Sequence, residues 1–343
     1  MILVDAVYIN QSGGKVLLVY LISSIKKLGN INNYFFLLDD RLESNVLDSL
    51  DPTNYTKVSP SETNRRLFYK KLDPKIKTIF CFANIPPTRK IVNRSVFILI
   101  HNALLLKDNK QLPIKQRLLF YLKRSYIKLN NSHKYKWIVQ TQNMSNLLCQ
   151  NLNIKKASVL TLPFYEANRY GGVNQKLMSN NKNFLYVADG VPQKNHSNLL
   201  LAWEQIFDQY NLPLALHLTI PIGFTTLINE IGRLKDKGLQ IFNHGVCNAE
   251  EIKDLYTSCN YLVFPSLTES FGLPLIEAAE AGCEIIASNL NYVYDVVTPY
   301  STFNPFDIND MAKKIVAAYH QKVPGKTELL VEDGIHKLIR LLN

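Results

Sequence analysis

Two carboxylates eight positions apart, Glu269 and Glu277, have the spacing in this sequence that most directly suggests chemistry. A glycine and a proline that can open a helix, Gly272 and Pro274, lie between them. The apolar run 260–264 predicts a buried strand before this segment, and the residues after it predict a helix. A glycine turn that joins a strand to a helix N-terminus is an anion-binding arrangement, because the first helical amides are unpaired.

Each of the two acids has a chemical use and an ordinary explanation. A carboxylate can accept both hydroxyl groups of a ribose, and a glycine allows the backbone to approach a ligand closely. Alternatively, Glu277 stabilises the dipole of a first helical turn and Glu269 caps a loop. The pair by itself leaves both explanations open.

The whole segment Phe264–Glu277 resembles the E-x7-E signature of the retaining glycosyltransferases of family 4, which have the GT-B fold. The Pro-Ser that ends the strand and the Phe-Gly-Leu-Pro core match as well. This resemblance implies that Glu269 is a catalytic residue at the donor sugar and that Glu277 binds the ribose of the nucleotide. The backbone amides expected to line the phosphate side belong to Ser270, Phe271, Gly272 and Leu273.

The segment 184–196 resembles the first strand and loop of the donor-binding domain of that family. Lys194 matches a lysine that pairs with the diphosphate, although a solvated surface lysine is the ordinary alternative. Asp189 stands where the family often has an arginine, so Lys194, loop amides and a helix terminus must offset more of the leaving-group charge. The loop at Gly245 is expected near the nucleotide base, although a simple turn would explain this glycine equally well.

A second glycine turn follows the first predicted strand, 2–9, and precedes a helix predicted from Val16 to Leu28. In the family, a loop like Gly13-Gly14 closes over the donor phosphates and borders the acceptor site. The lack of a G-x-G-x-x-G pattern argues against a dinucleotide fingerprint. The resemblance also makes His101, at the end of another apolar strand, a catalytic residue that reaches the donor sugar. A histidine in this position is often structural.

Charge is distributed unevenly along the 343 residues. Residues 1–172 hold 26 Lys/Arg and 10 Asp/Glu, a net charge of +16, whereas residues 173–343 have a net charge of −5. The densest basic stretch is Lys107–Lys136, where apolar residues lie between the cations. This pattern suits either an amphipathic helix on an anionic membrane or a surface helix with its apolar stripe toward the core. We find no signature of a nucleic-acid-binding motif.

Composition indicates a globular chain with substantial cores, since 47% of the residues are hydrophobic and 20% are charged. The longest apolar run, 96–106, is too short to span a bilayer, and no signal peptide is apparent. The five cysteines are scattered without metal-ligand spacing, which predicts reduced, buried thiols in a cytoplasmic protein. The basic stretch Lys107–Lys136 adds the expectation of peripheral binding to the inner face of the cytoplasmic membrane. We expect neither a metal nor another cofactor.

Alternating strands and helices predict two doubly wound α/β domains, at residues 1–170 and 171–325, with a polar linker at Glu166–Asn183. The resemblance implies that these Rossmann-like domains face each other across a cleft, as in GT-B enzymes. A last helix, about Glu328–Leu342, lies in a segment 326–343 that would cross back to the first domain. The predicted strands are Ile2–Ile9, Tyr34–Leu38, Thr78–Phe82, Ser95–Ile100, Trp137–Val139, Phe184–Val187, Leu214–Ile220, Gln240–Phe242, Tyr261–Phe264 and Glu284–Ala287.

The resemblance implies a retaining, metal-independent glycosyltransferase that moves a hexose from a nucleotide sugar to a glycan or a polyprenyl-diphosphate-linked glycan. Bacterial surface polysaccharide assembly, such as that of lipopolysaccharide or capsule, is the expected context. Two alternatives remain at this stage: a GT-B sugar-nucleotide epimerase or hydrolase, and a non-catalytic GT-B binding protein. The sugar, the base, the acceptor and the oligomeric state cannot be read from the residues.

Overall fold

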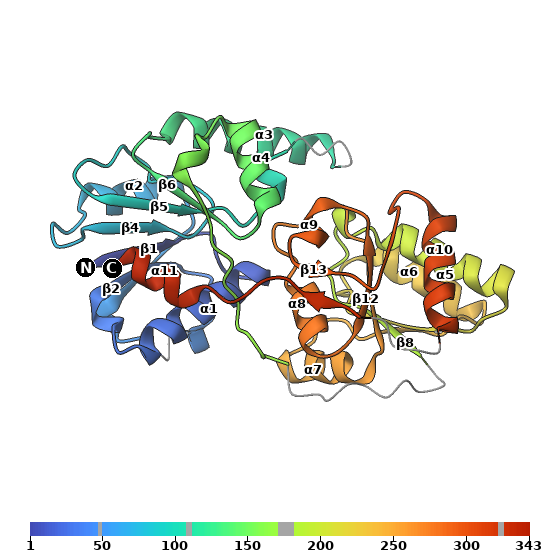
Figure 1. Cartoon of the computed structure of the whole chain (residues 1–343). Coiled ribbons are helices and arrows are strands. Elements are labelled where there is room, and N and C mark those ends of the chain that lie inside the picture. The colour runs from blue at the N-terminus through green and yellow to red at the C-terminus, as the bar shows by residue number, and fades with distance from the viewer. Residues whose placement is uncertain (47–49, 108–111, 171–181, 322–325) are drawn as a thin grey trace. The chain divides into compact units, whose positions relative to one another are not determined.

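The computed structural model describes the chain except residues 47–49, 108–111, 171–181 and 322–325, so most of the predicted linker Glu166–Asn183 lies outside the described residues. The chain forms two compact units (Figure 1). Unit 1 comprises Met1–Glu166 and Glu332–Asn343, and unit 2 comprises Ala167–Val331. The chain therefore begins and ends in the same unit.

Unit 1 is built on a seven-stranded parallel sheet with the order β3-β2-β1-β4-β5-β6-β7. Its strands are β1 Ile2–Ala6, β2 Tyr34–Asp39, β3 Tyr55–Val58, β4 Thr78–Cys81, β5 Ser95–Leu99, β6 Lys136–Val139 and β7 Val159–Thr161. Its helices are α1 Ser12–Lys27, α2 Glu62–Lys70, α3 Ile114–Asn130, α4 Gln142–Leu152 and α11 Ile335–Leu342. The last of these, α11, packs against α1.

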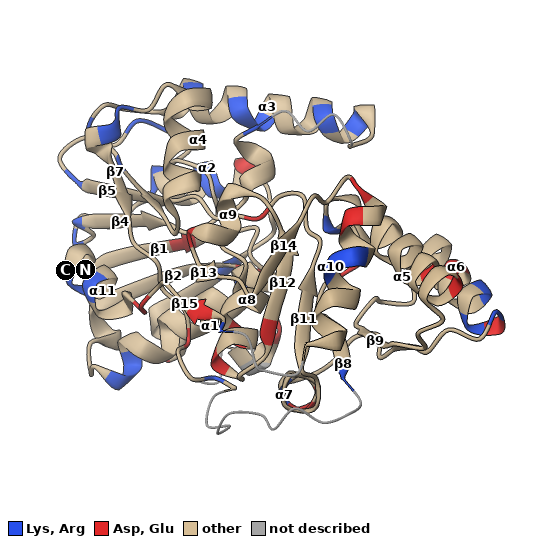
Figure 2. Cartoon of the chain, turned by 45° about the vertical axis from the view of Figure 1, so that its right-hand side comes forward, with Lys and Arg blue, Asp and Glu red and all other residues tan. Residues whose placement is uncertain are grey.

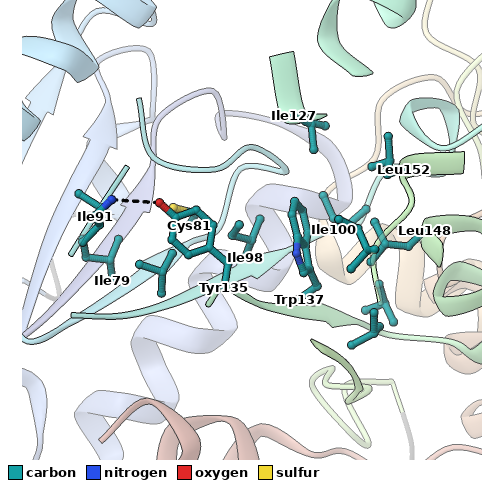
Figure 3. Packing of buried hydrophobic residues seen from close by; sticks show 14 of the residues in the cluster. Ile79, Cys81, Ile91, Ile98, Ile100, Ile127, Tyr135, Trp137, Leu148 and Leu152 are labelled. Atoms are coloured by element: carbon teal, nitrogen blue, oxygen red, sulfur yellow. Dashed lines mark hydrogen bonds between the residues drawn. The ribbon is translucent and has the colours of Figure 1, made fainter. Parts of the chain in front are cut away.

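Continuous apolar runs explain the central strands of unit 1. Every residue of β1 and of β4 is buried, as expected for parallel strands covered on both faces. The core beyond these strands is aromatic and aliphatic, with Trp137 and Tyr135 each only 1% exposed (Figure 3). The Tyr135 hydroxyl accepts a hydrogen bond from the Ile91 amide at 3.1 Å, which satisfies the polar end of a buried ring.

Unit 2 repeats the same plan with the parallel order β10-β9-β8-β11-β12-β14. These strands are β8 Asn183–Tyr186, β9 Ala215–Leu218, β10 Ile241–Asn243, β11 Tyr261–Phe264, β12 Glu284–Ser288 and β14 Ser301–Phe303. The helices are α5 His196–Tyr210, α6 Thr225–Asp236, α7 Ala249–Ser258, α8 Leu273–Glu280, α9 Asn291–Tyr294 and α10 Ile308–His320. An antiparallel pair, β13 Val297–Thr298 and β15 Glu328–Leu329, completes the described strands of the unit.

The structure corrects several predicted boundaries. The first strand ends at Ala6 rather than Ile9, and the first helix begins at Ser12 rather than Val16. The last helix covers only Ile335–Leu342, because Glu328 and Leu329 pair with Val297 and Thr298 as a strand. A two-residue strand carries no periodic pattern, so the sequence did not distinguish it from the start of the helix.

The cysteine prediction is partly wrong. All five cysteines are free thiols, but only Cys81, Cys259 and Cys283 are buried, whereas Cys149 and Cys247 are half-buried. A separate observation concerns membrane spans: within the described residues, no helix combines the length and the apolar character needed to cross a bilayer.

Candidate active site

The segment between β11 and α8 forms a tight turn whose backbone conformation favours glycine at position 272. Gly272 has a φ of +84°, and a Cβ there would lie 3.1 Å from Leu275 Cδ1. Leu273 is the first residue of α8, and no side chain caps this helix at Gly272. The positive end of the α8 dipole therefore lacks a side-chain cap, a condition suited to an anion.

Lys194 and Glu269 form an ion pair at the carboxyl ends of β8 and β11. Lys194 Nζ lies 2.6 Å from Glu269 Oε1, and the two side chains are 20% and 12% exposed. These residues are 75 positions apart in the sequence. The structure thus brings together the predicted diphosphate cation and the predicted sugar-binding acid.

Several hydrogen bonds fix the two loops that carry this pair. The Leu267 amide donates to the Gln193 carbonyl at 2.8 Å, and Asn195 Nδ2 donates to the carbonyl oxygen of Pro265 at 3.2 Å. The buried Tyr186 hydroxyl donates to the Lys194 carbonyl at 2.8 Å and lies 2.9 Å from Ser266 Oγ. Tyr186, Asn195 and Ser266 were not identified from the sequence, because their role depends on contacts between distant loops.

Glu277 lies one turn into α8, in a largely buried environment. The Tyr256 hydroxyl donates to Glu277 Oε2 at 2.9 Å. Burial raises the pKa of Glu277, while the hydrogen bond from Tyr256 and the positive charge of Arg169 act in the opposite direction. A carboxylate held in this way has one anchored oxygen and can still accept a ligand hydroxyl at the other.

His196 begins α5 and positions the loop before Lys194. Its Nε2 lies 2.9 Å from the Asp189 carbonyl, and burial lowers its pKa to about 4, so the ring is neutral at physiological pH. Asp189 Oδ1 is buried and has no hydrogen-bond partner among the described residues. Residue 189 thus places a carboxyl group where an arginine would supply a positive charge.

Gly245 follows β10, at the opposite end of the sheet from β14. It has a φ of +70°, and a Cβ there would meet no atom within 4 Å. Beside it, His244 Nε2 lies 3.0 Å from His217 Nδ1. One strand, β9, separates β10 from β8, so the structure does not bring Gly245 into the Lys194–Glu269 pair.

In unit 1, His101 lies just after β5 and is held on one side by two neighbours. Its Nε2 lies 3.1 Å from the Phe82 carbonyl and 3.1 Å from Asn84 Nδ2, and its own amide donates to Asn84 Oδ1 at 2.7 Å. Burial lowers its pKa to about 4. When Nε2 carries the proton and donates it to the carbonyl, Nδ1 is an acceptor for a hydroxyl group.

Gly13 and Gly14 lie in the first turn of α1, so the helix begins before these glycines and not at Val16 as predicted. A Cβ at position 14 would lie 3.1 Å from His101 Cε1. The glycine therefore serves a close approach between the start of α1 and the imidazole. Unit 1 thus brings Gly14 and His101 together.

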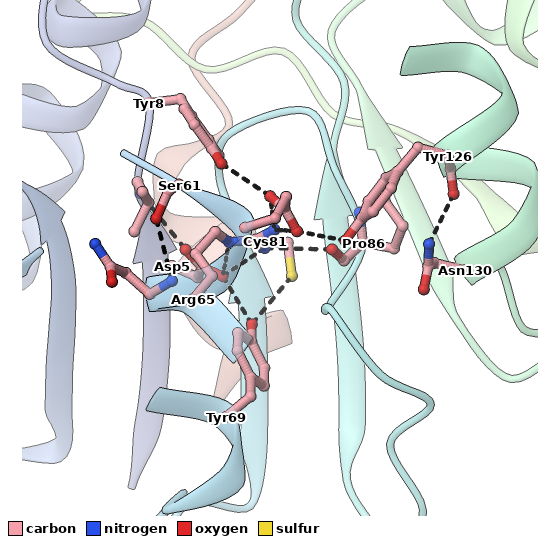
Figure 4. A network of polar contacts seen from close by, with 12 residues as sticks. Asp5, Tyr8, Ser61, Arg65, Tyr69, Cys81, Pro86, Tyr126 and Asn130 are labelled. Carbon is pink, nitrogen blue, oxygen red and sulfur yellow. Dashed lines mark hydrogen bonds and ion pairs between the residues drawn. The ribbon is translucent and has the colours of Figure 1, made fainter. Parts of the chain in front are cut away.

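A buried polar network supports the start of unit 1 (Figure 4). Arg65 donates to Asp5 Oδ2 at 2.7 Å and to Glu62 at 2.9 Å. Glu62 in turn accepts hydrogen bonds from the hydroxyl groups of Tyr8 and Tyr126, at 3.0 and 2.5 Å. Since Asp5 lies in β1 and Tyr8 follows this strand, the network anchors the chain that leads to α1.

The described part of the chain contains no cluster of three His, Cys, Asp or Glu side chains that could hold a metal ion. The positive groups near the two loops that carry the ion pair of unit 2 include Lys194 and the amide end of α8. Such groups can stabilise negative charge on a phosphorylated ligand.

The comparisons with known proteins agree with this geometry. The model of the family described as "Glycosyl transferases group 1" matches residues 174–330, which form most of unit 2. This part of the chain is therefore similar to group 1 glycosyltransferases. It contains Lys194, Glu269 and Glu277.

Two curated relatives are mannosyltransferases by name. The O-antigen chain mannosyltransferase RfbU of Salmonella typhimurium is 30% identical over 159 residues, covering 46% of this chain and 42% of that protein. The serotype-specific mannosyltransferase WbdA of Escherichia coli is 27% identical over 153 residues, covering 43% of this chain and 19% of that protein. The chain therefore spans less than half the length of these relatives.

Solved structures establish the fold. The structure of Alr3699/HepE of Anabaena in complex with UDP-glucose matches with a TM-score of 0.69 and 14% sequence identity, covering 93% of this chain and 89% of that one. The fold of the chain is GT-B, with two doubly wound parallel α/β units, as the sequence predicted. At this identity the match concerns the fold alone.

Proposed function

We propose that the chain is a retaining glycosyltransferase that moves a hexose from a nucleotide sugar to a glycan acceptor in bacterial surface polysaccharide biosynthesis. The observation that carries this proposal is the Lys194–Glu269 pair at 2.6 Å, beside the α8 N-terminus in the domain that the family model matches. One acid, one cation and a helix N-terminus in a small volume suit a ligand with both hydroxyl groups and phosphates.

In the proposed reaction, each group has one task. Glu269 accepts hydrogen bonds from the donor sugar, and Glu277 accepts them from the ribose. Lys194 and the amides of Ser270 to Leu273 stabilise the charge that develops on the diphosphate as the glycosidic bond breaks. The departing phosphate oxygen deprotonates the acceptor hydroxyl on the same face of the sugar. The protein thus acts through positioning and electrostatics.

Mannose is the first sugar to test, because both relatives are mannosyltransferases by name. A panel of UDP-, GDP- and dTDP-sugars, scored by thermal stabilisation of the protein, would identify the base and the sugar. We expect one nucleotide to raise the melting temperature of the wild type and to have a much smaller effect on Glu277→Gln. If no nucleotide sugar stabilised the wild type, the proposal would be wrong.

Product analysis separates transfer from the two alternative activities. We expect nucleotide release only when an acceptor glycan is present, and a product whose anomeric configuration by NMR equals that of the donor. Nucleotide release without acceptor would instead indicate an epimerase or hydrolase. Donor binding without any turnover would indicate a binding protein.

Helix α3 of unit 1 exposes both apolar and basic side chains. Ile127 is its only buried residue and packs in the core of unit 1. Five apolar side chains recur at helical spacing on the opposite face and are 56% to 80% exposed: Ile114, Leu118, Tyr121, Leu122 and Leu129. The helix also carries five Lys/Arg and no Asp/Glu. Blue segments along α3 mark its cations in Figure 2. The apolar stripe of the basic stretch Lys107–Lys136 therefore faces away from the core.

We further propose that α3 docks on an anionic membrane surface and that the acceptor is linked to a lipid diphosphate. An exposed apolar stripe with flanking cations fits the boundary between headgroups and acyl chains. Each lysine near such a surface contributes about 1 kcal/mol, an effect that salt weakens. On an ordinary surface helix, the exposed leucines would have no apolar surface to pack against.

Vesicle sedimentation tests this proposal. The double variant Leu118→Gln/Leu122→Gln should bind phosphatidylglycerol vesicles at least about tenfold more weakly than the wild type. Leu67→Gln is a matched control, because Leu67 lies on α2 and is 53% exposed. Lys115, Lys123 and Lys128 are suitable for neutralisation, whereas Arg124 donates to the Lys107 carbonyl and should be kept. Absent or salt-insensitive binding by the wild type would contradict membrane docking.

A further inference from the structure

The donor site proposed for unit 2 has too little positive charge in its loops. The diphosphate of a nucleotide sugar carries two negative charges, and the loop after β8 supplies Lys194 alone. Asp189 adds a carboxylate whose Oδ1 is buried without a partner among the described residues. A second cation near Glu269 or Glu277 would balance this charge.

Arg169 lies close to Glu277, although it is 108 positions before it in the sequence. Its guanidinium lies 5.4 Å from the centre of the Tyr170 ring. Tyr170 packs on Tyr256 with ring centres 5.5 Å apart, and Tyr256 donates the hydrogen bond to Glu277. The positive charge of Arg169 also opposes the rise that burial causes in the pKa of Glu277. The arginine therefore shares the surroundings of the predicted ribose acid.

The neighbours of Arg169 hold it on this side of unit 2. The backbone of Asn168 donates a hydrogen bond to Glu280, one turn after Glu277 on α8. Tyr170 is only 5% exposed. Both flanking residues are thus anchored against α7 and α8, so the guanidinium is presented beside Glu277.

We propose that Arg169 is the second cation of the donor site, pairing with Glu277 before the donor binds and with the donor diphosphate afterwards. This inference rests on the proposed function. When the ribose hydroxyl groups donate to Glu277, the carboxylate no longer needs the guanidinium. A guanidinium matches phosphate oxygens with two parallel hydrogen bonds.

The same exchange applies to the Lys194–Glu269 pair. In this proposal, each acid that binds a hydroxyl group balances one cation while no donor is bound. Binding of one nucleotide sugar replaces both ion pairs, since its hydroxyl groups satisfy the acids and its diphosphate satisfies the cations. The site therefore keeps its charges compensated before and after binding, which avoids leaving a buried carboxylate unpaired.

Calorimetry with nucleotides and nucleosides tests the role of Arg169. The probes are UDP, GDP, uridine and guanosine, and the variant is Arg169→Gln. For the base that the wild type prefers, we expect the affinity for the diphosphate to fall about ten- to a hundredfold, as for the loss of a hydrogen bond to a charged group. The affinity for the nucleoside should change less than threefold. Lys253→Gln on the exposed face of α7 removes one charge elsewhere in unit 2 and should change neither.

Three outcomes would contradict the inference, each in a recognisable way. Equal losses for nucleoside and diphosphate would show that Arg169 acts only by supporting Glu277. Unchanged affinities would show that it has no part in donor binding. If Arg169→Gln also lowered the melting temperature, Arg169→Lys, which keeps the charge, should restore diphosphate binding in part, and a failure to restore it would contradict the inference as well. If the wild type bound neither diphosphate, the proposed function itself would fail.

Discussion

Unit 1 and unit 2 share a strand order, yet the ion pair near the carboxyl edge of each sheet is built differently. In unit 1 the side chains of Arg65 and Asp5 are 1% and 0% exposed, and Arg65 also binds Glu62 and the Pro86 carbonyl. In unit 2 the side chains of Lys194 and Glu269 are 20% and 12% exposed. Neighbouring residues cover the first pair completely, whereas the second pair remains accessible to solvent.

This difference separates a structural pair from one that can exchange its partner. A fully buried pair must keep both members, because removing one leaves an uncompensated charge in a low-dielectric interior. A partly exposed pair is less costly to open, since water and a ligand can replace either member. We therefore expect substitutions in unit 1 to affect stability and those in unit 2 to affect activity.

Arg65→Met should have the largest effect on folding. It leaves the Asp5 carboxylate buried without its cation, which costs about 3–5 kcal/mol of unfolding free energy. Urea denaturation would measure this loss. The double variant Arg65→Met/Asp5→Leu should recover much of the stability, because it removes the buried charge as well. A loss below about 1 kcal/mol in the single variant would show that the pair is not structural.

Lys194→Gln and Glu269→Gln should lower the transfer rate strongly and the stability only slightly. We expect the transfer rate to fall about 10²- to 10³-fold for each, as for the loss of a group that stabilises transition-state charge. Their unfolding free energy should change by at most about 1 kcal/mol. Initial-rate kinetics and urea denaturation on the same preparations would test both statements. A large loss of stability with normal transfer would make the comparison between the two pairs invalid.

Acid should destabilise both units through one histidine in each, His101 and His196. Burial lowers both pKa values from 6.5 to about 4, so the unfolded chain takes up protons first as the pH falls. Their contribution to stability is therefore present above pH 6.5 and is lost between pH 6.5 and 4, by an amount on the order of 3 kcal/mol for each histidine. Urea titrations across this range would measure it. His196→Asn should flatten the profile, and an unchanged profile would count against a buried neutral ring.

The smallest expected difference is the one in stability between Gly14→Ala and Gly232→Ala. Both glycines lie in helices, where alanine normally adds about 0.5–1 kcal/mol of stability. A Cβ added to Gly232, in α6, would meet no atom within 4 Å, so this position should show the gain. At position 14 the Cβ would lie 3.1 Å from His101 Cε1, so the gain should be absent. Equal increases in melting temperature would show that the approach to His101 imposes no constraint.

The central strands of both sheets were predictable, because parallel strands covered on both faces are continuous apolar runs. Three of the four edge strands in the two described sheets, β3, β7 and β14, were missed. In β3 no residue is buried, and β7 and β14 have only three residues each. An edge strand needs less burial, so its sequence signal is weaker.

Prediction of the candidate site had a similar limit. The spacing of Glu269 and Glu277 and the lysine at 194 could be recognised, since they lie in short local patterns. Tyr186, Asn195 and Tyr256 could not, because each acts through a hydrogen bond to a residue on another loop or helix. No local pattern encodes a contact of that kind.

The sequence by itself determined the doubly wound α/β class, the glycosyltransferase signature and the concentration of cations in the first half. Only the tertiary structure showed that Lys194 pairs with Glu269 and that the apolar stripe of α3 is exposed. Helical spacing places apolar residues on one face, but it does not state whether that face meets a core or the solvent. That choice depends on which neighbours cover the helix, and these come from distant parts of the chain.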